Sequence, residues 1–294
     1  MRSKFSSFFK KNVTINFMKW KEKIKEIIRI KFKFLKWLFF ILIGALILYF
    51  AYGIFISPER EGKVWEFGQE KLPKVLIQNK NIKIENLRDF DWSKKEKNKI
   101  EKYKDFEFSL DEIQSVDLLI SHFTKQEFIA HVFVIFNLKN GENFGVSIES
   151  RRIAGQKFSI FGGMWYKYNL IYVVATEKDL ISLREKRNEK LYRYHLILSP
   201  EESQKLFLNL ARKEDELVKK PEFYNTIFTN CTNLLVEEME KVRDFDFPFL
   251  EKYFLPGYTD EALYEENLLD KVEIFPQPSW EDYKEKHLLV GGRK

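Results

Sequence analysis

The chain has 294 residues and a formal net charge of +6, from 50 Lys and Arg residues against 44 Asp and Glu residues. Residues 1–36 carry twelve basic and two acidic residues, so the rest of the chain has a net charge of −4. That acidic balance argues against nucleic-acid binding, which depends on a basic surface of the folded part. Cys231 is the only cysteine, which excludes an intramolecular disulfide and a cysteine-rich zinc site.

An uncharged apolar stretch covers residues 37–56 (WLFFILIGALILYFAYGIFI). Twenty helical residues extend about 30 Å, which is the thickness of the hydrocarbon core of a bilayer. A cleaved signal peptide is the alternative, but its apolar core would have only about 7–15 residues and would follow a short basic segment. Because 36 residues precede this stretch, we predict a permanent transmembrane helix.

The basic residues of the N-terminal arm predict how this helix is oriented. Lys and Arg close to a spanning helix tend to stay in the cytoplasm, so residues 1–36 are expected inside and the later chain on the far face. The arm serves as the topology signal alone, which we favour, or also as a basic helix on the anionic inner leaflet. We assign residues 57–80 to a connecting segment. Residues 81–294 form one α+β domain, because no repeat or flexible linker divides them.

Several stretches rich in aromatic and β-branched residues predict strands. Residues 128–138 (FIAHVFVIFNL) and 143–150 (NFGVSIES) flank an Asn-Gly turn signal. We predict a tight hairpin there, in which Asn-Gly supplies the positive φ angles of the turn. Residues 168–175 and 191–198 are predicted as further strands.

Helix start signals follow these strands. Thr176 is the expected N-cap of one helix, with acidic residues in the first turn. Ser199 and Pro200 begin a longer helix that we expect to end near Lys219. A short helix is expected near residues 260–269.

Cys231 follows Asn230, the predicted N-cap of another helix, so the thiol lies in its first turn. Free backbone N–H groups and the helix dipole favour a thiolate there, and we expect a pKa well below the ordinary value of about 8.5. Papain-like hydrolases place such a cysteine against a sheet that presents a histidine. Cys231 is therefore the candidate nucleophile. A small buried hydrophobic residue beside Leu234 and Leu235 is the alternative.

The candidate base comes from four histidines: His122, His131, His195 and His287. His131 lies on the predicted hairpin, where antiparallel pairing puts Glu149 at or one place from the position across from it. We therefore expect His131 to act as base and Glu149 to orient it. His195 is the second candidate by location. A core histidine with satisfied hydrogen bonds, and Glu149 paired with a neighbouring arginine, are the structural alternatives.

Other chemistries have weaker support. The glycine doublets do not form a phosphate-binding loop before a helix, and no spacing of His and acidic residues predicts a metal site. Acidic pairs such as Glu201-Glu202 lie on predicted helix faces and serve solvation. We expect neither a cofactor nor a metal.

Four segments resemble the Lnb N-terminal periplasmic domain family, a bacterial family. They are IENLRDFDW (84–92), IAHVFVIFNLKNGENFGVSIESRR (129–152), YNLIYVVATEKDLISLREKR (168–187) and FYNTIFTNCTNLL (223–235). The resemblance rests on their order and on the combination of a strand histidine, Ser-x-Glu-x-Arg and Tyr-Asn-x4-Asn-Cys-Thr.

The resemblance implies an exported domain that is similar to a permuted papain-like thiol hydrolase, with an antiparallel sheet packed on helices and the histidine ahead of the cysteine. The Asn-Cys helix start is similar to that of the lecithin retinol acyltransferase group. The implied roles are His131 as base, Cys231 as nucleophile, Glu149 as orienting residue and Asn230 beside the nucleophile. Arg151, Tyr224 and Asn225 also match and are implied as supporting or substrate-binding residues.

Together these features lead to the hypothesis of a membrane-anchored periplasmic thiol hydrolase or acyltransferase. It would lie in a bacterial inner membrane with its N-terminus in the cytoplasm, and act on an amide or ester bond of a peptide, cell-wall or lipid-linked substrate. The alternative is a non-catalytic envelope module that binds peptide, glycan or lipid in the same groove. The two hypotheses differ in whether Cys231 reacts.

Overall fold

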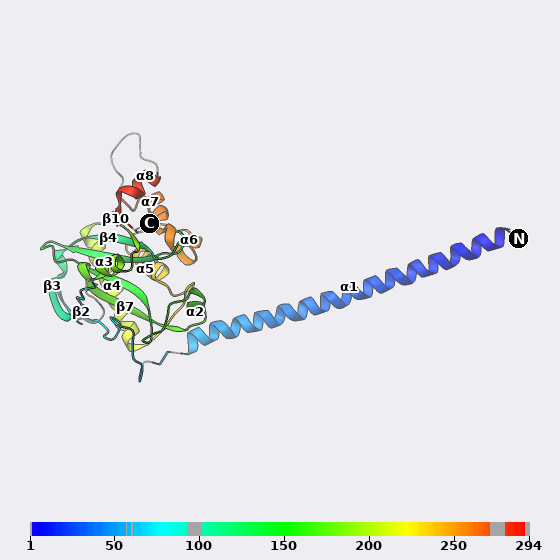
Figure 1. The fold of residues 1–294 in the computed structure, drawn as a ribbon, viewed down its shortest axis with the longest axis horizontal. Helices are drawn as coiled ribbons and strands as arrows, with labels where there is room; N and C mark the ends of the chain where they lie inside the picture. The colour runs from blue at the N-terminus through cyan, green and yellow to red at the C-terminus, as the bar shows by residue number, and fades with distance from the viewer. Residues whose placement is uncertain (1, 57, 60, 93–101, 271–279, 292–294) are drawn as a thin grey trace. The chain divides into compact units, whose positions relative to one another are not determined.

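The computed structural model describes residues 2–56, 58–59, 61–92, 102–270 and 280–291, and it has the α+β fold class that the sequence predicts. The chain divides into two compact units, residues 1–56 and residues 57–294 (Figure 1). The second unit is the domain that contains the candidate site.

Helix α1 (Arg2–Phe55) forms the first unit. Within the described residues it is the one helix that is long and apolar enough to cross a membrane, and the qualifying stretch is Lys23–Gly53. Length and composition of this kind fit a membrane span or a signal sequence. The predicted span, residues 37–56, overlaps this stretch.

The domain is built on one mixed sheet (Figure 1). Its strands are β1 (Lys74–Gln78), β2 (Asn81–Arg88), β3 (Tyr103–Ser109), β4 (Ile113–His122), β5 (His131–Leu138), β6 (Phe144–Arg151), β7 (Tyr168–Thr176), β8 (Lys190–His195), β9 (Phe223–Tyr224) and β10 (Leu288–Val290). Their order among the described residues is β1-β2-β7-β6-β5-β4-β8-β10, with β3 also paired to β2 and β9 to β7. The expected antiparallel sheet is only partly right, because β2 meets β7 in parallel at Arg88 and Ala175.

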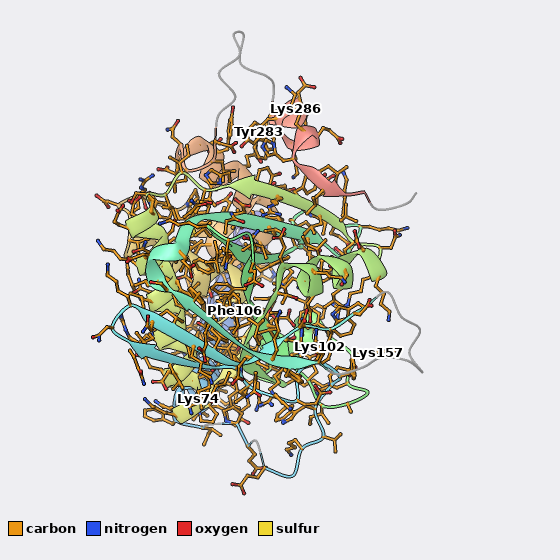
Figure 2. All side chains as sticks on the ribbon, turned by 90° about the vertical axis from the view of Figure 1, so that its left-hand side faces the viewer. Lys74, Lys102, Phe106, Lys157, Tyr283 and Lys286 are labelled. Atoms are coloured by element: carbon orange, nitrogen blue, oxygen red, sulfur yellow. The ribbon has the colours of Figure 1, made fainter. Side chains whose placement is uncertain are left out.

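Helices cover both faces of this sheet. They are α2 (Ile160–Met164), α3 (Glu177–Lys186), α4 (Pro200–Lys219), α5 (Cys231–Glu240), α6 (Phe249–Tyr253), α7 (Thr259–Glu265) and α8 (Trp280–Lys286), with a 3-10 turn, η3 (Pro256–Tyr258). Figure 1 shows α7 and α8 together at one end of the domain. In Figure 2 Lys74, Lys157 and Lys286 lie toward the periphery of the domain, while Phe106 lies toward its middle.

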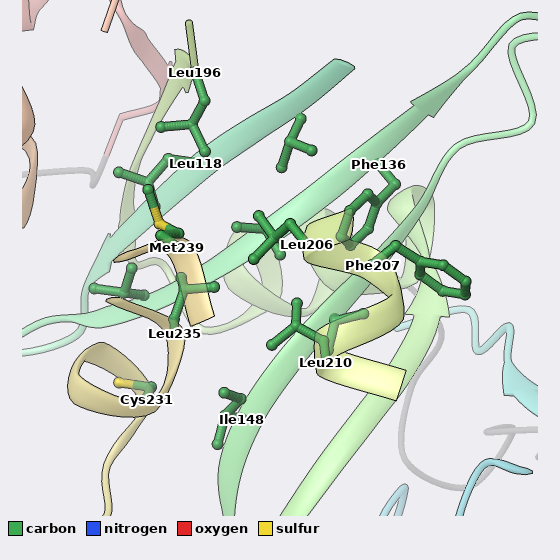
Figure 3. Close-up of a cluster of buried hydrophobic side chains, with 14 of the residues drawn as sticks. Leu118, Phe136, Ile148, Leu196, Leu206, Phe207, Leu210, Cys231, Leu235 and Met239 are labelled. Carbon is green, nitrogen blue, oxygen red and sulfur yellow. The ribbon is translucent and has the colours of Figure 1, made fainter. Parts of the chain in front are cut away.

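Successive strand residues point to opposite faces, so each strand contributes to two cores. The larger core lies between the sheet and helices α4 and α5, and it includes Leu118, Val134 and Cys231 (Figure 3). The smaller core lies on the other face, where Phe133 packs with Leu180 of α3. Phe133 and Val134, which are adjacent in β5, therefore belong to cores on opposite faces of the sheet.

Most predicted elements after residue 127 are confirmed, because each begins with a strong local signal. The Thr176 side chain caps α3 by accepting from the N–H of Asp179. Ser199 caps α4, which ends at Lys219 as predicted. Asn230 caps α5, so Cys231 is its first residue.

The hairpin turn differs from the prediction. Only Gly141, of the Asn-Gly pair, has a positive φ, at +78°. Five residues connect β5 to β6, and Asn143 accepts from the N–H of Leu138, which closes the loop without a second positive φ. The strands themselves are confirmed.

A buried ion pair connects β2 to α3. Asp179 is fully buried and accepts from the Arg88 guanidinium at 2.8 Å and from the backbone N–H of Phe90 at 2.7 Å. It also accepts from the indole of Trp92 at 2.9 Å. Arg88 donates in turn to the carbonyl of Gly68. The pair thereby holds α3 and residue 68 on the sheet.

Replacing Asp179 by alanine should lower the free energy of unfolding by about 3–5 kcal/mol, because it leaves the buried Arg88 charge uncompensated. Thermal unfolding of the full chain in a mild detergent, followed by tryptophan fluorescence, measures the loss. Asp215→Ala is the matched control, since the Asp215–Lys219 pair is exposed and should contribute at most about 1 kcal/mol. Equal destabilisation by the two variants would refute this role of Asp179.

Candidate active site

A cavity of about 400 Å³ brings Cys231 and His131 together at one end of β5 and β6. Its lining residues are Gln69, Phe123, Ala130, His131, Ile148, Glu149, Ser150, Arg152, Phe158, Arg184, Arg187, Glu189, Tyr224 and Cys231. A larger cavity of about 700 Å³ lies beside α3 and contains none of the candidate residues. The smaller cavity is therefore the candidate site.

The cavity forms where two strands separate. The pairing of β5 with β6 covers only Val134–Phe136 against Phe144–Val146. Continuing that register would set His131 across from Glu149, yet the ladder has already ended there. The opening joins the two faces of the sheet, because the lining includes Cys231 from one core and the neighbours of Phe133 from the other.

The Asn230 cap fixes the backbone of Cys231. Its side-chain oxygen accepts from the N–H groups of Thr232 and Asn233, and its amide donates to the carbonyl of Thr226. Asn233 completes the capping box by accepting from the N–H of Asn230. Asn230 thus holds the backbone at the start of α5 in place. Its own side chain does not line the cavity.

The expected low pKa of Cys231 is wrong for this arrangement. Burial raises the pKa of the thiol, although the N–H of Val132, the Thr232 hydroxyl and the first N–H groups of α5 act in the opposite direction. The cysteine is only 6% exposed, so the loss of hydration outweighs the helix terminus. The raised pKa favours the thiol form of the sulfur.

His131 is held by a chain of two hydrogen bonds. Its Nε2 lies 2.7 Å from the hydroxyl of Ser147, and that hydroxyl donates to Glu149 at 2.8 Å. A serine has one hydrogen to donate, so Nε2 must carry a proton and donate to Ser147. No described residue bonds Nδ1, which is left as the acceptor of the ring. The chain selects the tautomer that a base at Nδ1 needs.

Glu149 orients His131 through Ser147 and not directly, which corrects the expected contact. Its oxygen lies 3.9 Å from Nε2, outside hydrogen-bond range. Arg184 of α3 lies 3.3 Å from the same oxygen, and Gln69 donates to the other at 3.4 Å. Burial acts to raise the pKa of Glu149, but Arg184 and His131 outweigh it and hold that pKa well below the ordinary value.

The pKa shifts of His131 and Cys231 favour the uncharged form of each side chain. Burial, together with the positive charge of Arg184, lowers the pKa of His131 to about 3. Its ring stacks on Phe133, in the core opposite to that of Cys231. No hydrogen bond joins the ring to the sulfur among the described residues. The two groups line the same cavity without a hydrogen bond between them.

The remaining expected residues take different positions. Tyr224 lines the cavity beside Cys231. Arg151 is buried outside it and donates to the carbonyl oxygens of Gln69 and Glu70. Asn225 is also outside the lining, and it accepts from two N–H groups of the loop ahead of α5. Arg151 and Asn225 therefore hold the segments that frame the site.

His195, the second candidate, lies outside the cavity and bonds the carboxylate of Asp117 at 2.9 Å. This bond raises the pKa of His195. His287 bonds the carbonyl of Tyr283. In the part of the chain that the structure describes, no group of three His, Cys, Asp or Glu residues could hold a metal ion.

Sequence reasoning missed Ser147, Gln69 and Arg184. Ser147 belongs to the Ser-x-Glu motif and shares a strand face with Glu149, because residues two apart point the same way. That spacing could have predicted that Ser147 lies beside Glu149. Gln69 and Arg184 come from distant segments, and no local pattern places them near His131.

A helix-borne cysteine and a strand-borne histidine that line one cavity of an α+β domain define a candidate thiol site. Residues 99–253, which are 155 of the 294 residues, match the Lnb N-terminal periplasmic domain, and the chain belongs to this family. No curated protein and no solved structure matches the chain.

The low pKa of His131 predicts that acid destabilises the domain. An unfolded histidine takes up a proton near pH 6.5, whereas folded His131 stays neutral to about pH 3. Its contribution to stability is therefore present above about pH 6.5 and is lost as the pH falls toward 3, with a slope of up to about 1.4 kcal/mol per pH unit. His131→Gln should flatten the decline between pH 7 and 5, measured by thermal unfolding at each pH.

His195→Gln is the control with the opposite sign. Because its folded pKa is raised, His195 stabilises the fold below about pH 6.5 and loses this effect as the pH rises. Its replacement should steepen the acid decline slightly, since the side chain is half exposed. An unchanged pH dependence in His131→Gln would show that His131 titrates normally.

Proposed function

We propose that this protein is a membrane-anchored periplasmic thiol hydrolase or acyltransferase. It acts on an amide or ester bond of a peptide, cell-wall or lipid-linked substrate, with Cys231 as nucleophile and His131 as base. The observation that carries the proposal is the cavity lined by both residues, in which the Glu149–Ser147 chain leaves Nδ1 of His131 free to accept a proton. A partly buried chain of this kind is costly unless its hydrogen bonds are made.

The arrangement of elements supports a papain-like site in permuted order. The cysteine begins a helix that packs on the sheet, and the histidine stands earlier in the chain on β5. Helix α1 provides the inner-membrane anchor in this proposal, with residues 1–36 in the cytoplasm and the domain in the periplasm. Membership in a periplasmic domain family fits this orientation.

In the reaction, the Cys231 sulfur attacks the substrate carbonyl as its proton moves to Nδ1 of His131. The new C–S bond replaces the C–N or C–O bond, and the leaving amine or alcohol takes that proton. The N–H groups at the start of α5 and the N–H of Val132, which already face the sulfur, stabilise the oxyanion. Water or an acceptor amine then attacks the thioester and restores the thiol.

The resting arrangement places a condition on this mechanism. Proton transfer needs the sulfur and Nδ1 within about 3 Å, directly or through one water. In our proposal, substrate binding in the opening between β5 and β6 brings the thiol and the imidazole to this distance. The neutral states of both groups then make the step general-base catalysis and not attack by a preformed thiolate.

A non-catalytic binding module is the second candidate. The raised pKa of Cys231 and the lack of a bond between the sulfur and His131 favour it. In that case the cavity would bind a peptide, glycan or lipid group, and its three arginines, Arg152, Arg184 and Arg187, would hold an anionic part of the ligand.

Acylation of Cys231 separates the two candidates. The full chain in mild detergent, mixed with p-nitrophenyl butanoate, should release a burst of p-nitrophenol and gain one butanoyl group at Cys231, located by peptide mass spectrometry. His131→Gln should slow this acylation by a factor of about 10²–10⁴, the usual contribution of a general base. Ser147→Ala should slow it less, because the base is kept and only its orientation is lost.

His195→Gln is the matched control and should acylate at the wild-type rate, since His195 lies outside the cavity. Acylation that is equally fast in His131→Gln would remove the base from the mechanism. A chain that gains no butanoyl group while folded, but does so after denaturation, would leave the binding module as the function.

A further inference from the structure

We infer that the domain docks on the membrane surface through an apolar rim beside the cavity. The rim, named here the aromatic rim, consists of large apolar side chains that are 39–73% exposed. They are Phe123, Phe128, Phe161, Trp165, Phe228, Phe249, Leu250 and Phe254.

The rim comes from segments that contact one another. Helix α2, which carries Phe161, lies against the loop ahead of α5, where Thr226 donates to the carbonyl of Ile160. Gly257 of η3 donates to the carbonyl of Phe128 and follows α6 closely in the chain. Figure 1 shows α2 and α6 along one side of the domain. The exposed side chains are thus carried by two groups of contacting segments, α2 with the loop ahead of α5, and residue 128 with η3 and α6.

The rim is continuous with the candidate site. Phe123 belongs to the rim and also lines the cavity, where its ring contacts Phe158 at a centroid distance of 6.2 Å. Phe158 precedes α2 by two residues and also contacts Tyr224 beside Cys231. Whatever covers the rim therefore lies at the entrance to the cavity.

The length of the tether points to a bilayer as the partner. Eight residues, 56–63, separate the end of α1 from Val64, whose carbonyl accepts from the N–H of Ala154. Eight residues extend at most about 30 Å. With α1 in the membrane, as proposed above, this length limits how far Val64 can lie from the bilayer, and Ala154 lies next to Val64. Helix α2 begins six residues after Ala154.

The composition of the rim fits a lipid interface. Trp165 is 72% exposed and Phe161 is 73% exposed. Tryptophan is enriched at the level of lipid headgroups, and phenylalanine is common on the apolar faces of interfacial helices. Lys157 and Lys167 flank α2, both exposed, and Figure 2 shows Lys157 at the edge of the domain. Basic residues beside an apolar surface add attraction to anionic lipids.

The experiment measures how close Trp165 comes to lipid. The full chain is reconstituted in vesicles of unbrominated phosphatidylcholine and phosphatidylglycerol, or of the same lipids brominated on the upper acyl chain. Subtracting the spectrum of Trp165→Phe isolates the emission of Trp165. Docking predicts at least about two-fold weaker Trp165 emission in the brominated vesicles, together with poor quenching by acrylamide.

Trp280→Phe provides the control, because Trp280 begins α8 (Figure 1), packs on Tyr283 and is not part of the rim. Its isolated emission should respond little to bromine. The double replacement Phe161→Ser and Phe249→Ser should restore Trp165 emission, whereas Val218→Ser, which changes an exposed residue of α4, should not. Trp165 emission that acrylamide quenches and bromine does not would overturn the inference, as would protection of Trp165 by a second copy in detergent.

Docking rests on the proposed function only in that α1 is taken to anchor the chain in the membrane. It does not depend on the reaction proposed for Cys231. Acylation of Cys231 by a soluble ester reports the chemistry alone. A chain that acylates normally while bromine leaves Trp165 unaffected would refute docking and leave the thiol mechanism standing, and the reverse result would do the opposite.

Discussion

One partly buried carboxylate, that of Glu149, is the constraint on which the site depends. It stays ionised because Arg184 lies 3.3 Å away, and an ionised carboxylate can only accept hydrogen bonds. Ser147 must therefore donate to it, and His131 must donate to Ser147. Arg184 in turn is presented by α3, which the Arg88–Asp179 ion pair holds on the sheet. The ion pair between β2 and α3 thus determines, through three contacts, which nitrogen of His131 can act as a base.

The second constraint is geometric. Adjacent residues of a strand face opposite sides of a sheet, so a histidine at 131 and a thiol that packs with Val132 would normally be separated by the backbone. The early end of the β5–β6 ladder removes this barrier and makes one cavity from two faces. A fully paired hairpin would be more stable and would close the opening. The opening that forms the site therefore requires that three residue pairs between β5 and β6 stay unpaired.

Local sequence signals predicted most elements in the later part of the fold. Contacts between residues distant in sequence could not be predicted from these signals. Thr176, Ser199 and Asn230 each predict the start of a helix, because a capping side chain bonds backbone N–H groups within the next few residues. The positions of Cys231 at a helix start and of His131 on a strand were likewise predicted from local sequence. The raised pKa of Cys231 was not predicted, because it depends on how completely the packing of distant segments removes water from the thiol. Strands β1 to β4 carry weaker patterns, and β2 joins β7 in parallel from far along the chain.

The tautomer of His131 tests this arrangement most directly. In the full chain labelled with ¹⁵N-histidine, loss of one signal in His131→Gln assigns the ring among only four histidines. The hydrogen-bond chain requires Nε2 protonated and Nδ1 unprotonated at pH 7, with no change down to pH 5, and a shift in this pattern in Ser147→Ala. A ring that is doubly protonated at pH 7, or protonated at Nδ1, would mean that Glu149 and Ser147 do not prepare His131 to take the proton of Cys231.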